Sequence, residues 1–159
     1  MNRLYGWAPI GEQAIITQSS HGKRLNFVGA MAMDGPRALM TYEGTMNTAC
    51  MLTFTKTHLV PSLNQGDTVV MDGLSIHKNT EVRELIESAG AKVLILPAYS
   101  PELNPIEHLW STLKARMRAI GCSNWTELAA QVHRIWKELP MGFYANWVKN
   151  CGYSPAQSA

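Results

Sequence analysis

The chain has 159 residues, of which 46% are hydrophobic and 16% are charged, with a formal net charge of +2 at pH 7. These values are typical of a single globular domain with a hydrophobic core. They exclude a low-complexity chain, and no apolar run is long enough to span a membrane.

Charge is distributed unevenly along the chain. From Leu103 onward there are six Lys and Arg residues but only three Glu. This excess favours contact with nucleic acid, although a solvated helix face is the ordinary interpretation of any single lysine. The cysteines at positions 50, 122 and 151 form no CxxC pair, and no apolar segment follows Arg3 as in a signal peptide. We therefore expect a reducing, cytoplasmic location.

The first half of the chain is expected to form strands and then a helix. Segments 11–20 and 24–44 are typical of strands, and Asp34-Gly35-Pro36 inside the second predicts a hairpin turn. Residues 46–63 have helical spacing, and Pro61 predicts that this helix ends near Val60.

The next segment is typical of a parallel strand–helix–strand unit. Residues 68–71 (TVVM) predict a short strand buried on both faces, and residues 92–97 predict a second short strand. Between them a helix is expected over 79–90, with Asn79 or Thr80 as its N-cap and Gly90 as its stop. This order implies a right-handed parallel crossover.

The C-terminal part is expected to be helical. After the Pro-rich loop AYSPELNP, apolar residues with a 3.6-residue period predict a helix from about Pro105 to Ile120, with Asn104 as N-cap. Two more helices are expected over 124–140 and 141–153, and residues 154–159 are expected to be a flexible tail. Strands before helices imply a mixed sheet and an α/β fold.

Two carboxylates occupy informative positions. Asp72 ends the strand TVVM, where open α/β sheets bind ligands, and Glu107 lies in the first turn of the predicted helix. Each has a structural alternative. Asp72 with Gly73 can simply open a turn. Glu107, three residues after Asn104, can complete a capping box.

The segment VVMDGLSIHK followed by LPAYSPELNPIEHLWSTLK resembles the C-terminal part of the catalytic domain of bacterial insertion-sequence transposases of the Tc/mariner superfamily. The likeness runs from about Tyr5 to Tyr153, so residues 1–153 are expected to be part of such a domain. It implies an RNase H-like fold with a triad of Asp, Asp and Glu (or Asp). Asp72 matches the second carboxylate and Glu107 the third, with 34 residues between them.

The resemblance also implies a cofactor and partners. Asp72 and Glu107 would hold divalent ions, Mg²⁺ or Mn²⁺, for metal-dependent DNA cleavage and strand transfer. The partners would be transposon-end and target DNA, with a homodimer as the intact enzyme, at the bacterial nucleoid. Residues expected to touch DNA are His77, Lys78, Lys114, Arg116 and Arg118.

Two of these expectations concern local positioning. His77 has two alternatives to a phosphate contact. It can orient a ligand, or it can be a structural residue whose hydrogen bonds are made within the protein. Tyr99, Pro101 and Pro105 are expected to fix the loop that aims Glu107.

The chain departs from the family pattern at several points. Gly73 stands where Asn is usual and is expected to loosen the loop beside Asp72, and Ala98 replaces a usual Pro. No residue matches the first triad Asp, because Asp34 and Glu43 are poorly placed, and the helix-turn-helix region has no counterpart. The fold is therefore expected to lack its first, central strand, which leaves two unpaired sheet edges.

Three hypotheses are compared. In the first, the chain is part of a transposase. Either its N-terminal residues re-pair, or an upstream-encoded polypeptide supplies the strand and the Asp, so that the isolated chain is weakly active or inactive. Alternatively, the chain is a catalytically incomplete remnant, or a DNA-binding or oligomerising fragment that modulates a full-length transposase. An unrelated phosphatase with Asp72 as nucleophile would need further phosphate-binding motifs, and the sequence has none.

Overall fold

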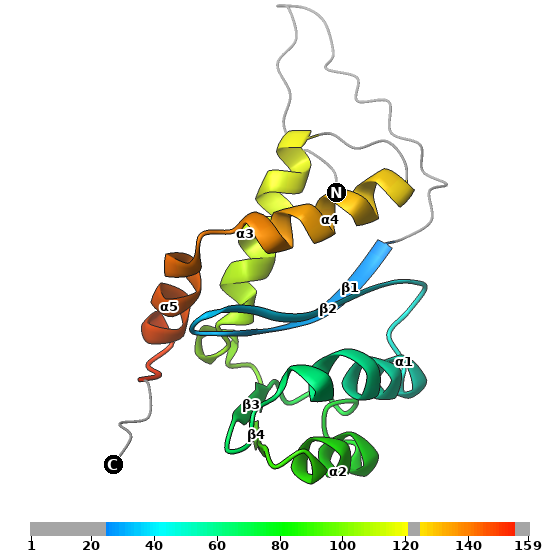
Figure 1. Cartoon of the computed structure of the whole chain (residues 1–159), viewed down its shortest axis with the longest axis vertical. Helices are drawn as coiled ribbons and strands as arrows, with labels where there is room; N and C mark the ends of the chain where they lie inside the picture. Colours follow the sequence, from blue (N-terminus) through cyan, green and yellow to red (C-terminus); the bar gives the residue numbers. More distant parts are fainter. Residues whose placement is uncertain (1–24, 121–124, 155–159) are drawn as a thin grey trace, which may run out of the picture.

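The computed structural model describes residues 25–120 and 125–154 (Figure 1). Its strands are β1 (Leu25–Ala32), β2 (Gly35–Glu43), β3 (Thr68–Met71) and β4 (Lys92–Ile95). Its α-helices are α1 (Thr48–Phe54), α2 (Thr80–Ser88), α3 (Ile106–Ile120), α4 (Trp125–Glu138) and α5 (Met141–Asn150). A π-helical turn η1 (Thr55–Leu59) and two 3-10 turns, η2 (Val60–Ser62) and η3 (Pro101–Leu103), complete the elements.

Strands β1 and β2 form the predicted hairpin. They are antiparallel, from Leu25 opposite Glu43 to Ala32 opposite Gly35, with a register shift between Ala30 and Met31. The hairpin is confirmed, but its turn lies at Met33–Asp34, and Gly35, with φ +136°, already pairs with Ala32 as the first residue of β2. The strand expected over 11–20 lies outside the described residues.

The helix predicted over 46–63 changes its backbone hydrogen-bonding pattern along its length. Its regular part, α1, ends at Phe54 and the path continues through η1 and η2 to Ser62. Pro61 lies at the start of η2, where its missing N–H costs no hydrogen bond. The helical path therefore passes slightly beyond the predicted end near Val60.

Strands β3 and β4 are parallel and connected through α2, as predicted. Thr68 lies opposite Lys92 and Met71 opposite Ile95. The Asn79 side chain caps α2 by accepting from the Val82 amide at 3.3 Å. The expected burial of 68–71 on both faces is wrong, because Thr68 is exposed and only Met71 is buried. Among the described residues, β4 is the one strand paired with β3, so the other side of β3 has no described strand to cover it.

The hairpin separates two hydrophobic clusters. Leu39 of β2 packs with Leu109, Val132 and Tyr144, which come from α3, α4 and α5. On the opposite face, the neighbouring residue Ala38 belongs to a cluster with the buried side chains Met51, Phe54, Met71 and Ile86. Helices α4 and α5 thus cover one face of the hairpin while α1 and η1 cover the other (Figure 1).

The two strand pairs are separate two-stranded sheets. Within residues 25–120 and 125–154, no strand joins β1 to β3. The described elements agree with the expected α/β class, whereas the expected gap at the centre of the sheet stays a prediction, because residues 1–24 lie outside the described part. None of the helices in the described part is both long and apolar enough to cross a membrane.

Candidate active site

Asp72 directly follows β3, and its carboxylate is held by two neighbours. Its Oδ1 accepts a hydrogen bond from the Leu74 amide at 3.0 Å and lies 2.6 Å from Nδ1 of His77. An ionised carboxylate only accepts hydrogen bonds, so Nδ1 is the protonated ring nitrogen. No described residue bonds Oδ2, which leaves that oxygen for another ligand. The turn alternative therefore does not exclude a ligand role, because the turn engages Oδ1 alone.

The environment of Asp72 is partly open. Its side chain is 40% exposed and that of His77 is 19% exposed. His77 thus lies in the position expected of a residue that orients a ligand. Gly73 leaves room for a side chain, since an added Cβ would lie 3.4 Å from the Leu96 carbonyl oxygen. The loop beside Asp72 is held by its own hydrogen bonds despite the glycine.

Glu107 is exposed in the first turn of α3. A capping box would require its carboxylate to accept from the Asn104 amide. That amide instead donates to the Pro101 carbonyl at 3.0 Å. The capping-box alternative is therefore wrong, and the exposed Glu107 carboxylate lies at the N-terminal, positive end of the helix dipole.

The loop before α3 is held by a residue that sequence analysis missed. The Tyr153 hydroxyl donates to the Leu103 carbonyl at 2.8 Å. Burial raises the pKa of Tyr153, so the phenol remains a donor over the ordinary pH range. The residue expected to hold this loop, Tyr99, is instead fully exposed with φ 59°. No local signal could identify Tyr153, which lies 50 positions away from its partner.

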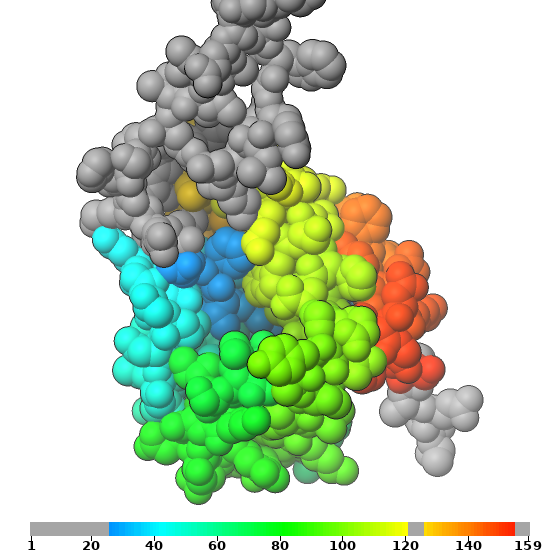
Figure 2. All heavy atoms as spheres, turned by 180° about the vertical axis from the view of Figure 1, so that it is seen from behind, coloured from blue at the N-terminus to red at the C-terminus, as the bar shows by residue number. Residues whose placement is uncertain are grey.

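Asp72, His77 and Glu107 line one cavity of about 620 Å³. Its walls include β1 and β3, together with Phe54 on one side and Trp110 of α3 on the other. Figure 2 shows β1, in blue, at the bottom of a hollow between the green segment that carries β3 and the yellow-green helix α3. No group of three or more His, Cys, Asp or Glu side chains in the described ranges could hold a metal ion. Asp67 also lines the cavity, so three carboxylate side chains lie on its wall, but they form no such group.

The basic residues expected to touch DNA divide into two groups on α3. Lys114 and Arg118 follow Glu107 by seven and eleven residues, close to two and three turns of an α-helix, so they share its face. Arg116 lies on the opposite face, where its charge opposes the rise in the pKa of Tyr144 that burial causes. Lys78 is exposed one residue after His77. Helical spacing therefore places Lys114 and Arg118 on the Glu107 face of α3 and Arg116 on the opposite face.

Comparison with known proteins identifies the class. Residues 1–128 match the family model described as DDE superfamily endonuclease. This match covers most of the chain, so the chain belongs to that family. The Tc1 transposase of Caenorhabditis elegans is 38% identical over 65 residues, and the Tcb1 transposase of Caenorhabditis briggsae is 35% identical over the same length. Each match covers 41% of this chain and 24% of the relative.

Solved structures agree on the fold. The chain superimposes on Mos1 transposase in a paired-end complex with the left transposon end, with a TM-score of 0.75 and 16% identity, over 94% of this chain and 47% of that one. It also superimposes on the catalytic domain of Mos1 mariner transposase, with a TM-score of 0.62 and 14% identity, over 82% of this chain and 75% of that one. The fold is therefore the RNase H-like α/β fold of that catalytic domain. The chain spans about a quarter of the length of the curated relatives it matches.

Proposed function

We propose that this chain is the C-terminal part of the catalytic domain of a DNA transposase, extending over residues 1–153, that cleaves DNA and transfers strands. The observation that carries the proposal is the convergence of Asp72 and Glu107 on one cavity, from β3 and α3 respectively. Membership of the DDE endonuclease family supports the same chemistry.

Asp72 and Glu107 are the proposed metal ligands. Oδ2 of Asp72 and the exposed carboxylate of Glu107 are hard oxygen donors, which suit Mg²⁺ or Mn²⁺. A Mos1 complex with Mn supports this assignment. The chemistry that such ions supply is activation of the attacking oxygen and neutralisation of charge on the phosphodiester. His77 orients Asp72, and α3 stabilises the charge on Glu107.

The proposed substrate is DNA, as transposon ends and as target, and the intact enzyme is proposed to be a homodimer. Support comes from the Mos1 paired-end complex and from the basic face of α3, where Lys114 and Arg118 can position phosphates. We also propose a bacterial source and a nucleoid location, on the likeness of residues 69–114 to insertion-sequence transposases.

One observation favours a second candidate function. Although Asp67, Asp72 and Glu107 line the cavity, no group of three or more acidic, His or Cys side chains in the described residues could hold a metal ion. A chain with that deficit would bind DNA or a full-length transposase without cleaving, as a modulating fragment or a remnant.

The test is Mg²⁺-dependent nicking of a DNA duplex by this chain, alone and mixed with the polypeptide encoded immediately upstream. We expect nicking in the mixture and its loss with Asp72→Asn or with Glu107→Gln. His133→Ala, an exposed substitution on α4, is the control that should retain activity. DNA binding without nicking in the mixture would favour the modulating fragment.

A further inference from the structure

We propose that Tyr99 is a stacking site for an unpaired DNA base beside the carboxylate of Asp72. The site lies on the two loops that follow β3 and β4, and the exposed side chain of Leu74 adds an apolar contact. The inference deepens the proposed function and rests on it for one point, that a DNA phosphodiester lies at Asp72.

Tyr99 presents its ring entirely to solvent. The side chain is 102% exposed, so the fold gives the ring no packing partner. Its φ of 59° lies in the left-handed region, which few residues other than glycine adopt. An exposed aromatic ring and a rare backbone conformation both disfavour the folded state, and no contact of the ring offsets them. Residues held in such conformations cluster at functional sites.

The loop that carries Tyr99 lies against the loop that carries Asp72. A Cβ built on Gly73 would lie 3.4 Å from the Leu96 carbonyl oxygen and 3.7 Å from the Ala98 Cα. Since consecutive Cα atoms are about 3.8 Å apart, the Tyr99 Cα lies within about 8 Å of that position. This distance is close to two nucleotides, because successive phosphates of one strand are about 3.4 Å apart along the helix axis. A strand with a phosphate at Asp72 therefore brings its neighbouring bases to Tyr99.

Both loops are fixed by hydrogen bonds of their own. In the first loop, the Leu74 amide donates to Oδ1 of Asp72 at 3.0 Å, and the His77 amide donates to the Leu74 carbonyl at 3.0 Å. In the second loop, the Leu103 amide donates to the Ser100 carbonyl at 3.2 Å. The exposed ring is thus attached to an ordered backbone, so stacking needs little further ordering.

The composition of the two loops suits a nucleic-acid strand. Residues 73–79 and 96–101 include Lys78 but no acidic residue. Lys78 is exposed, and the Leu74 side chain is 59% exposed. Sites for single-stranded DNA combine aromatic rings, on which bases stack, with basic residues along the phosphates. Apolar side chains such as leucine insert between bases that have been unstacked. An unpaired base is therefore the ligand that these side chains fit.

Fluorescence anisotropy with two short oligonucleotides tests the stacking. One is a thymidine oligonucleotide, and the other has the same phosphates but abasic sugars. We expect the full chain to bind the first about tenfold more tightly, because stacking on an aromatic ring adds affinity that phosphates do not supply. Tyr99→Ala should lower this ratio of affinities to about one, whereas Tyr99→Phe, which retains an aromatic ring, should preserve it.

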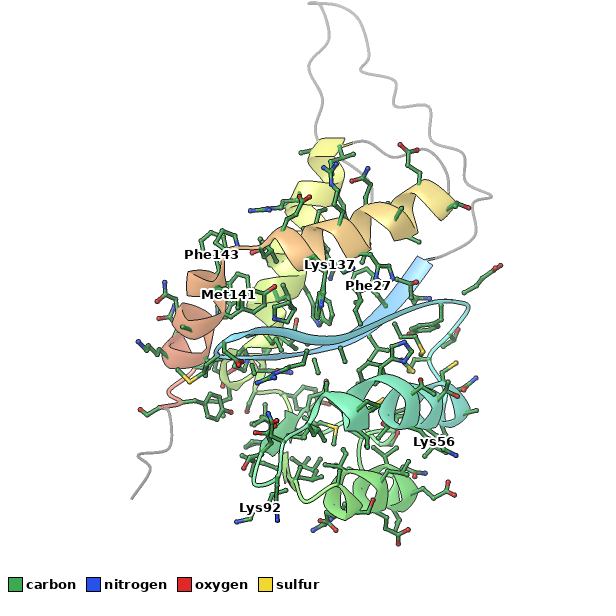
Figure 3. The ribbon with its side chains drawn as sticks, in the orientation of Figure 1. Phe27, Lys56, Lys92, Lys137, Met141 and Phe143 are labelled. Atoms are coloured by element: carbon green, nitrogen blue, oxygen red, sulfur yellow. The ribbon has the colours of Figure 1, made fainter. Side chains whose placement is uncertain are left out.

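Two control variants separate stacking from other effects. Phe143 is the matched aromatic residue, because its side chain is 40% exposed and Figure 3 shows it on α5, away from β3 and β4. Phe143→Ala should therefore keep the ratio. Lys78→Gln should weaken binding of both oligonucleotides equally, since it removes a phosphate contact that both share. Partial unfolding of a variant would lower both affinities together and leave the ratio unchanged.

Three outcomes would overturn the proposal. The parent chain could bind both oligonucleotides equally, Tyr99→Ala could keep the preference for bases, or Phe143→Ala could lose it as fully as Tyr99→Ala. Any of these results together with nicking in the mixture with the upstream polypeptide would leave the proposed function intact. A preference for bases that depends on Tyr99, in a chain that does not nick, would instead retain the stacking site and count against the proposed catalytic function.

Discussion

Nδ1 of His77 lies 2.6 Å from Oδ1 of Asp72, on the side of the carboxylate that also accepts the Leu74 amide. Both interactions engage the same oxygen, so they fix the orientation of the carboxylate, while no described residue bonds Oδ2. This arrangement is typical of residues that support a metal ligand without binding the metal themselves.

Removal of the His77 side chain should weaken metal binding. We expect His77→Ala to lower the affinity for Mn²⁺ by about 10- to 100-fold, because the Asp72 carboxylate loses its orienting partner. Calorimetric titration with Mn²⁺ measures this effect. His133→Ala should bind Mn²⁺ like the parent chain, and equal affinities for all three proteins would contradict the orienting role.

Neutralisation of the basic face of α3 should weaken DNA binding and its dependence on salt. Lys114→Gln with Arg118→Gln should reduce the slope of log affinity against log salt by about one for each phosphate that the protein no longer neutralises. Arg116→Gln is the matched control, because Arg116 lies on the opposite face near Tyr144. Fluorescence anisotropy with a DNA duplex over a range of salt concentrations measures the slopes. A larger effect from Arg116→Gln would show that DNA uses the other face.

Glu107→Gln should separate catalysis from stability. Since Glu107 does not complete a capping box, its amide replacement should change the free energy of unfolding by less than about 0.5 kcal/mol. Nicking in the mixture with the upstream polypeptide should nevertheless be lost. Urea denaturation provides the stability measurement. A loss of about 1 kcal/mol or more would instead indicate that the carboxylate caps the helix in solution.

Loss of the Tyr153 hydroxyl should loosen the loop that precedes α3. Tyr153→Phe removes the hydrogen bond to the Leu103 carbonyl and should lower the free energy of unfolding by about 1 kcal/mol. We expect faster amide exchange at Leu103 and Asn104, measured by NMR. Tyr99→Phe is the control, because that side chain is fully exposed. Equal exchange in both variants would rule out the proposed tether.

Stability should fall in alkaline solution because Tyr144 is buried. Burial raises the pKa of Tyr144 above its ordinary value of 10.0, and its hydroxyl donates to the Trp136 carbonyl at 3.2 Å. The folded state therefore holds this proton more tightly than the unfolded state. Its contribution is complete below about pH 10 and is lost as the pH rises through the higher folded value. Urea denaturation from pH 8 to 11 measures the decline.

Tyr144→Phe should make that decline smaller but should not remove it. Burial also raises the pKa values of Tyr42, Tyr153 and Cys151. Tyr99→Phe should leave the pH dependence unchanged. An identical decline in the parent chain and in Tyr144→Phe would show that Tyr144 does not contribute.

The local elements were predictable because their signals are short-range. The Asn79 cap and the apolar period of α3 each act over a few residues and have the predicted form in the structure, and the hairpin turn lies one residue before its predicted place. The division of the helical path into α1, η1 and η2 was not predictable, because it depends on packing around the buried residues Thr55 and Leu59.

The sequence by itself determined the strand that Asp72 follows and the helix whose first turn holds Glu107. It thereby determined the family resemblance as well. It could not decide between a capping box and a free carboxylate, because the outcome depends on the Pro101 carbonyl that occupies the Asn104 amide. Nor could it identify the hydrogen bond from Tyr153 to Leu103. It also could not show that Arg116, unlike Lys114 and Arg118, lies near Tyr144. Only the tertiary structure brings Asp72 and Glu107 to the wall of one cavity, because packing between distant segments leaves no trace in local sequence.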